Sequence, residues 1–181
     1  MLDGLLDRLA LATALRAARR RQVLAWRGGV ASRRVQVILP QEDAALHDAW
    51  MFVRWLDLPP EQVTPIALSG TLSYVPDAYA GHVRRIEAAE KNRLGLPRKA
   101  VLERLWGERP DVAVDLSQPF SAAGALLVGG GPAALRVGLY DVRAEPFYDL
   151  LVAPGADGAA DAVGRYLAAL NPPALPFVDV V

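Results

Sequence analysis

The clearest pattern of apolar and polar positions lies between residues 111 and 141, DVAVDLSQPFSAAGALLVGGGPAALRVGLYD. A continuous apolar run at 112–116 ends at Ser117, and a stretch of small apolar residues then leads to the breaker Gly-Gly-Gly-Pro at 129–132. A second apolar run follows the breaker. The pattern predicts a strand, a helix that starts at Ser117 and a second strand, which together form a βαβ unit.

Apolar residues elsewhere recur at helical or strand spacing and predict the remaining elements. Helices are expected at residues 2 to about 25, after the loop at 41–43, from Pro97 to Gly107 and at about 158–170. Strands are expected at 33–39, 63–68 and 146–152. Pro65 cannot donate to a ladder, which predicts an edge or a bulge for its strand. Residues 73–93 show no clear period, so a short strand and a helical turn are both compatible with them.

The spacing of large side chains predicts which face of each helix is buried. The first helix has a leucine stripe that is expected to dock on the body: Leu2, Leu5, Leu6 and Leu9, continued by Ala12. In the second helix, Trp50 belongs to an apolar stripe and is expected in the core, whereas Trp55 lies off that stripe and His47 is expected at the surface. Small residues around Gly124 are expected to let the helix after Ser117 approach the sheet closely.

The order of strands and helices predicts an α/β fold with an open, mostly parallel, doubly wound (Rossmann-like) sheet and a basic N-terminal helix. Strands as apolar as 112–116, where Asp115 alone is polar, are typical of parallel sheets covered on both faces. Three parts are expected along the chain: a basic helical arm at 1–30, a single Rossmann-like domain at 31–171 and an apolar tail at 172–181.

Composition restricts the chemistry of the 181-residue chain. It has no cysteine, which excludes thiol nucleophiles, disulfides and thiolate metal sites, and only two histidines, His47 and His82. No metal site and no cofactor is therefore expected. The sequence has no apolar run of about 18 residues, as a membrane span requires, and no signal-peptide pattern at its start. These features predict a soluble, cytoplasmic protein without a transmembrane segment.

The net charge of zero hides a strong asymmetry. Residues 1–34 hold eight arginines and two acidic residues, a net charge of +6, and the remainder has a net charge of −6. The arm suggests an anionic partner, with these candidate residues: Arg16, Arg19, Arg20, Arg21 and Arg27. Such a partner is a larger protein or a ribonucleoprotein assembly, with a membrane surface as the weaker option. Alternatively, the arginines form a solvated face that pairs with the acidic body.

Polar residues at the predicted strand ends give a second candidate site. Ligands of open α/β sheets bind at the carboxyl ends of strands, and Ser117 and Gln118 lie at one such end. A helix starting there offers free N–H groups to an anion, although a serine N-cap followed by a proline also occurs without any ligand. Together with Arg136 and Tyr140 these residues form the predicted ligand site. No glycine-rich phosphate loop accompanies them.

The 111–141 stretch resembles the βαβ segment in the N-terminal Rossmann-like half of heptosyltransferase-type (GT-B) glycosyltransferases. A D-x-x-x-D-L strand leads there into a helix and an R-x-G strand, and the matching residues here are Asp111, Asp115, Leu116, Arg136 and Gly138. The longer pattern of LPPEQVT, NRLGLP and EPFYDLLV resembles a family of small uncharacterised bacterial proteins that look like one such half. The resemblance implies a Rossmann-like fold and, because the second half is missing, carries no transferase activity with it.

Two functions are compatible with these patterns. The sequence favours a non-catalytic accessory or scaffold protein that binds a larger partner through its basic N-terminal helix. No catalytic residue is assigned, although an enzyme is not excluded. The alternative is a small-ligand protein for a sugar or a phosphate, or a minimal glycosyltransferase-like enzyme that uses the cleft at the strand ends.

Overall fold

The computed structural model describes residues 2–19, 33–69, 72–153 and 163–164, with side chains from Leu5 onward. The expected helix at 158–170 and the expected tail at 172–181 lie almost entirely outside these residues. The same holds for the end of the predicted first helix and for Arg20, Arg21 and Arg27.

The described residues form one open, all-parallel sheet of six strands in the order β3-β2-β1-β4-β5-β6. The strands are β1 (Val35–Leu39), β2 (Val63–Ala67), β3 (Arg84–Arg85), β4 (Val112–Asp115), β5 (Leu135–Leu139) and β6 (Leu150–Val152). This order is that of a Rossmann-like sheet, which confirms the predicted fold class. The strand assigned to 146–152 is shorter than expected, because Phe147 and Tyr148 precede it as buried loop residues.

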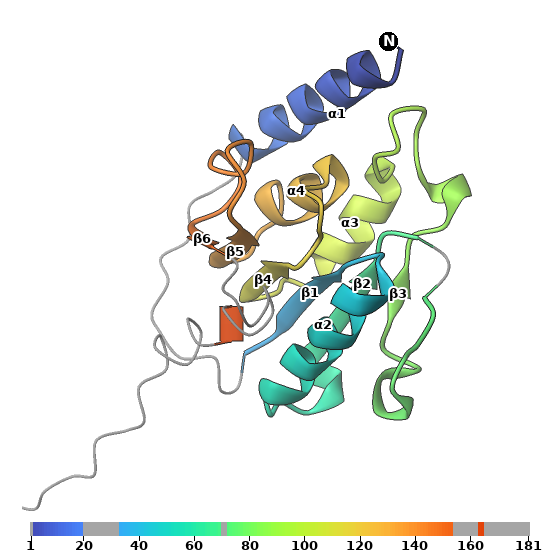
Figure 1. Ribbon diagram of the computed structural model, residues 1–181, viewed down its shortest axis with the longest axis vertical. Helices are drawn as coiled ribbons and strands as arrows, with labels where there is room; N and C mark the ends of the chain where they lie inside the picture. Colours follow the sequence, from blue (N-terminus) through green and yellow to red (C-terminus); the bar gives the residue numbers. More distant parts are fainter. Residues whose placement is uncertain (1, 20–32, 70–71, 154–162, 165–181) are drawn as a thin grey trace, which may run out of the picture.

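Helices cover both faces of the sheet (Figure 1). The α-helices are α1 (Leu2–Arg19), α2 (Asp43–Trp55), α3 (Lys99–Gly107) and α4 (Ala122–Gly129), and the short 3₁₀ segments are η1 (Pro60–Gln62), η2 (Asp77–Tyr79) and η3 (Ala88–Glu90). Trp50 and its neighbours on α2 pack against Val35, Val37 and Leu39, whereas α1, α3 and α4 pack on the face of Ile38. All five residues of β1 are buried, as a strand between two layers requires.

The helix after β4 starts later than the sequence predicts. Ser117 does not cap it; α4 begins at Ala122, and Ser121 is the N-cap, with its Oγ accepting from the Gly124 N–H at 3.4 Å. Pro119 gives the physical reason, because a proline disfavours helical backbone at the residue before it. Residues 117–120 therefore form a loop at the carboxyl end of β4.

The docked face of α1 is also different from the predicted one. The buried residues are Ala10, Ala14 and Ala18, whereas Leu5 and Leu9 are about half exposed. A Cβ atom on Gly130, directly after α4, would lie 3.1 Å from the Cβ of Ala17. Small side chains allow this close approach, Leu11 and Leu15 are partly buried beside them, and Leu5 and Leu9 are turned outward.

Two prolines behave differently from expectation. The strand β2 lies between β1 and β3 and is not an edge strand, but β3 pairs only with Ile66 and Ala67, so Pro65 lies beyond the end of β3. Pro97 does not open α3; the N-cap is Arg98, and Pro97 forms an antiparallel bridge with Lys91. The predictions for α2 are confirmed, since Trp50 is buried and Trp55 is half exposed.

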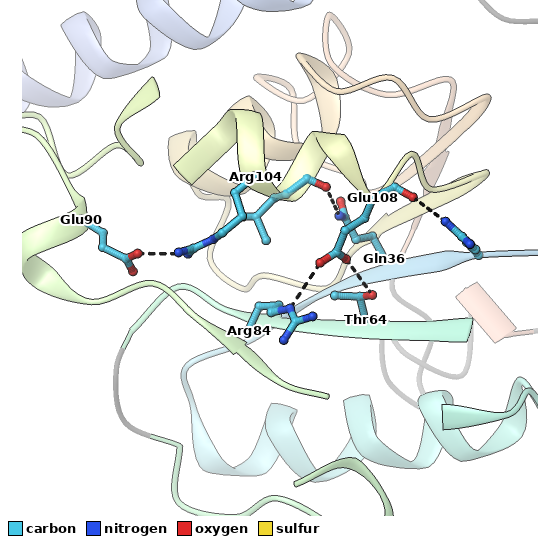
Figure 2. A network of polar contacts seen from close by, with 8 residues as sticks. Gln36, Thr64, Arg84, Glu90, Arg104 and Glu108 are labelled. Atoms are coloured by element: carbon cyan, nitrogen blue, oxygen red, sulfur yellow. Dashed lines mark hydrogen bonds and ion pairs between the residues drawn. The ribbon is translucent and has the colours of Figure 1, made fainter. Parts of the chain in front are cut away.

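Polar contacts tie the end of α3 to the sheet (Figure 2). The Gln36 side chain, buried in β1, donates its Nε2–H to the carbonyl of Leu105 at 3.1 Å. Glu108 directly after the helix accepts from Thr64 Oγ1 at 3.2 Å and from Arg84 Nε at 3.3 Å. Because β1, β2 and β3 all take part, α3 is held in a defined position over the sheet.

Candidate functional site

The strand order places a switch point between β1 and β4. The chain leaves β1 toward β2 on one side of the sheet and leaves β4 toward β5 on the other, so the loops after these two strands separate. A cavity of about 390 Å³ lies at this point, lined by Gln41 and Glu42 after β1 and by Ser117 and Gln118 after β4. The first half of α1 forms another part of its wall, with Asp7 among the lining residues.

A second cavity of about 240 Å³ adjoins the first along the loop after β4. Ser117 and Gln118 line both cavities, and Tyr140, which follows β5, lines the second. Three of the four predicted ligand residues are thus brought together. Arg136 is not, because it is the second residue of β5 and lies toward the amino end of that strand.

The Arg136 side chain is a structural group. It is 1% exposed, and its Nη1 donates to both carboxylate oxygens of Asp149 at 3.1–3.2 Å. The Arg136 N–H also donates to Asp149 Oδ2 at 3.0 Å, and the Asp149 N–H donates to the Arg136 carbonyl at 2.8 Å. The sequence predicted that Arg136 binds a ligand. In the structure, its contacts with Asp149 join β5 to the segment before β6.

The floor of the second cavity holds a buried carboxyl group that the ligand prediction did not include. Asp115 is 4% exposed; its Oδ2 accepts from the Tyr148 hydroxyl at 2.6 Å and its Oδ1 accepts from the Ser117 N–H at 2.9 Å. Burial raises the pKa of Asp115 above its usual range, and the contacts from Ser117 and Tyr148 offset part of this shift. The sequence signal for this buried carboxyl group is an acidic residue at the end of an otherwise apolar strand.

The Tyr148 hydroxyl remains a proton donor to Asp115 over the whole physiological range. Burial raises the pKa of Tyr148 well above its usual value, and the nearby Asp115 carboxyl adds to the shift. The Ser117 hydroxyl oxygen is also buried, and its contact with the Asp115 carboxyl lowers the pKa of that carboxyl.

The charges around the second cavity are unfavourable for a phosphate. Asp115 and Asp141 both line it, and the nearby cation Arg143 is already paired with Asp141 at 2.8 Å. Hydrogen bonds from Arg143 lower the pKa of Asp141 to about 2, so this residue is a carboxylate at physiological pH. Of the two ligand classes predicted from the sequence, a sugar with hydroxyl donors suits these groups better than a phosphate.

We expect an Asp115→Asn substitution to change the pH dependence of stability. The folded protein holds the Asp115 proton more tightly than the unfolded chain does, so this carboxyl stabilises the fold most below the usual pKa of 3.8. That contribution is lost as pH rises through the higher pKa of the folded state. Asparagine does not titrate, so the variant should gain stability relative to wild type as pH rises. Urea unfolding from pH 3.5 to about 8 measures this, and a difference that is constant or falls with pH would contradict it.

The outer face of α1 is the second candidate site. Leu5, Leu6 and Leu9 are 55%, 40% and 47% exposed, and Arg8, Arg16 and Arg19 are exposed as well. Leu5, Leu9, Ala12 and Arg16 follow one another at spacings of three or four residues, so they lie along one side of the helix. Of the five predicted partner-binding arginines, Arg16 and Arg19 are thus placed on an exposed face.

Searches of known proteins give no relative for this chain. No protein-family model, no curated protein and no solved structure matches it. The resemblance to heptosyltransferase-type glycosyltransferases therefore stays a prediction from the sequence motifs.

Among the described residues, no helix is long and apolar enough to cross a membrane. In the same part of the chain, no cluster of three histidine or acidic side chains is arranged to hold a metal ion.

Proposed function

We propose that this chain is a non-catalytic docking protein that binds an acidic surface of a larger protein through α1. The observation that carries the proposal is the orientation of this helix. Its alanine face, Ala10, Ala14 and Ala18, is buried against the body, and its opposite face presents leucines and arginines together. Half-exposed leucines on one face gain free energy from being covered, at about 25 cal/mol per Å² of apolar surface.

The firm attachment of α1 supports this role. The helix packs along α4, and Figure 1 shows it lying across the same side of the sheet as α3 and α4. A helix held in this way loses little conformational freedom when a partner binds it, and this lowers the cost of association. The Rossmann-like body thus acts as the support for a preformed binding face.

The distribution of side chains favours a protein over RNA or a membrane. An RNA backbone offers no apolar surface to cover Leu5 and Leu9, although it would attract the arginines. Helices that lie on membranes separate apolar and basic residues across the helix, whereas here Leu9 and Arg16 share one side. The first turns expose the leucines together with Arg8, and the last turn adds Arg16 and Arg19. An apolar patch beside an acidic patch on a protein matches this order.

Site-specific photocrosslinking tests the proposal. A photoreactive amino acid at Leu9 should yield a defined crosslinked protein in native extract, identified by mass spectrometry. The same amino acid at Met51, which is 53% exposed on α2 on the opposite face of the sheet, should not. The purified partner should then bind the purified chain, with an affinity that falls as salt rises from about 0.05 to about 0.3 M.

Replacement of four arginines by glutamine gives the matching loss of function. The combined Arg16→Gln, Arg19→Gln, Arg20→Gln and Arg21→Gln variant should bind the partner about tenfold or more weakly. The Arg16 and Arg19 substitutions should change thermal stability little, because both side chains are exposed and such substitutions usually alter stability by less than about 0.5 kcal/mol each. Unchanged crosslinking by this variant would contradict the proposal. Loss of crosslinking after nuclease treatment would indicate RNA, and binding that requires anionic vesicles would indicate a membrane.

A further inference from the structure

A groove of about 580 Å³ runs beside α1, on the side that faces α3. Thr13, Arg16 and Ala17 form the α1 wall, and Lys99, Leu102 and Trp106 form the α3 wall. It is separate from both cavities at the strand ends, with Leu96 alone shared with the larger of these. The predictions from the sequence did not include this groove.

The bottom of the groove is apolar. Leu126 of α4 lies in the floor, and Leu96 and Pro97 close one end. The half-buried Trp106 ring is fixed, because its Nε1–H donates to the carbonyl of Leu127 at 3.0 Å. The contacts that tie α3 to the sheet hold the opposite wall in place (Figure 2). An apolar side chain can therefore enter a preformed site here.

The charged residues that line the groove in the described part of the chain are all cations. They are Arg16, Arg98 and Lys99. Arg98 donates its Nε–H to the Lys91 carbonyl at 3.0 Å, which keeps the guanidinium beside the groove. Lys99 lies 3.4 Å from Glu103, but both side chains are well exposed, and such a pair contributes little. The groove thus combines an apolar floor with a cationic rim.

We infer that this groove binds an acidic peptide segment with one or two large apolar side chains. The inference deepens the proposed docking function and rests on it, because the segment would belong to the protein partner that covers α1. Charge complementarity selects aspartate and glutamate in the segment, and the apolar floor takes its anchor residue. The open groove between two helices suits a peptide better than a free fatty acid, whose chain requires an enclosed cavity.

A displayed library of random peptides of about 12 residues tests the inference without a known partner. Selection on the wild-type chain should enrich sequences with an apolar anchor flanked by Asp or Glu. These peptides should bind a Thr13→Trp variant about tenfold or more weakly, since the indole would fill the groove from an exposed position. Enrichment of basic or neutral sequences, or equal binding to Thr13→Trp, would overturn the inference. Competition by laurate but by no acidic peptide would assign the groove to fatty acids and also overturn it.

A second variant separates this inference from the proposed function. Leu5→Gln with Leu9→Gln alters the outer face of α1 and leaves every groove residue unchanged. The selected peptides should bind this double variant as they bind wild type, whereas the whole partner should bind it more weakly. If the partner binding falls and peptide binding to Thr13→Trp does not, the groove inference fails and the docking function stands. If only the groove variant has an effect, the outer face of α1 is not the docking site.

Discussion

A Gly124→Leu substitution is expected to destabilise the fold by at least about 1–3 kcal/mol, the usual cost of overpacking a core. Gly124 lies in the first turn of α4, directly over the Asp115 carboxyl group of β4. A Cβ atom at this position would overlap with Asp115 Oδ2 and would lie 3.0 Å from its Cγ. Asp115 cannot turn away easily, because Tyr148 and the Ser117 N–H hold it on both oxygens.

Urea unfolding of this variant measures the loss as a decrease in the free energy of unfolding. Gly107→Ala provides the matched control, because Gly107 also lies in a helix and a Cβ atom there would have no neighbour within 4 Å. The control should be neutral or more stable by up to about 1 kcal/mol, since alanine favours helix more than glycine does. A Gly124→Leu protein as stable as wild type would show that α4 does not approach the sheet as described.

Removal of the Asp149 side chain should cause the other large loss of stability. Asp149→Ala leaves the buried Arg136 guanidinium without the carboxylate that neutralises it, and breaking a buried pair costs about 3–5 kcal/mol. The Asp149 side chain is 31% exposed, so water can replace part of the contact and the lower end of that range is expected. Thermal and urea unfolding both measure the effect.

A double variant tests whether charge burial is the cause. Arg136→Met combined with Asp149→Ala replaces the pair by apolar groups, and it should recover part of the stability that Asp149→Ala alone loses. If the double variant is clearly less stable than Asp149→Ala, the uncompensated charge of Arg136 is not the cause of the stability that Asp149→Ala loses. Asp149→Ala within about 0.5 kcal/mol of wild type would contradict the structural role of the pair.

The apolar runs of the sequence predicted the central strands and the layer order, because buried parallel strands leave a strong local signal. The strand β3, with two residues, carries too little pattern to be recognised. The predicted start of α4 was wrong. Ser117 is a residue type that often caps helices, but Pro119 disfavours helical backbone at the residue before it. Contacts between a few atoms of neighbouring residues decide where such a helix begins, and the periodicity of apolar residues does not reveal them.

The candidate sites show the same limit. Arg136 was predicted in the cleft with Ser117 and Tyr140, although its position at the second residue of a strand places it away from the carboxyl end. The contact between Asp115 and Tyr148 joins residues 33 apart, which no local pattern reveals. For α1, the helical spacing of the leucines suggested the docked face, whereas the buried residues are Ala10, Ala14 and Ala18.

The pairing of β1 with β4 at the centre of the sheet has a consequence for folding during synthesis. Val35 pairs with Val112 in register, and the contact between Arg34 and Asp111 beside it spans 77 residues. At a translation rate of about 5–20 residues per second, β1 exists for about 4–15 seconds before the ribosome adds β4. During this interval the VQVIL strand, wholly buried in the finished sheet, lacks one of its two neighbours. Folding of the sheet is thus limited by its most distant partners, and the newly made first half exposes an apolar strand that the finished sheet buries.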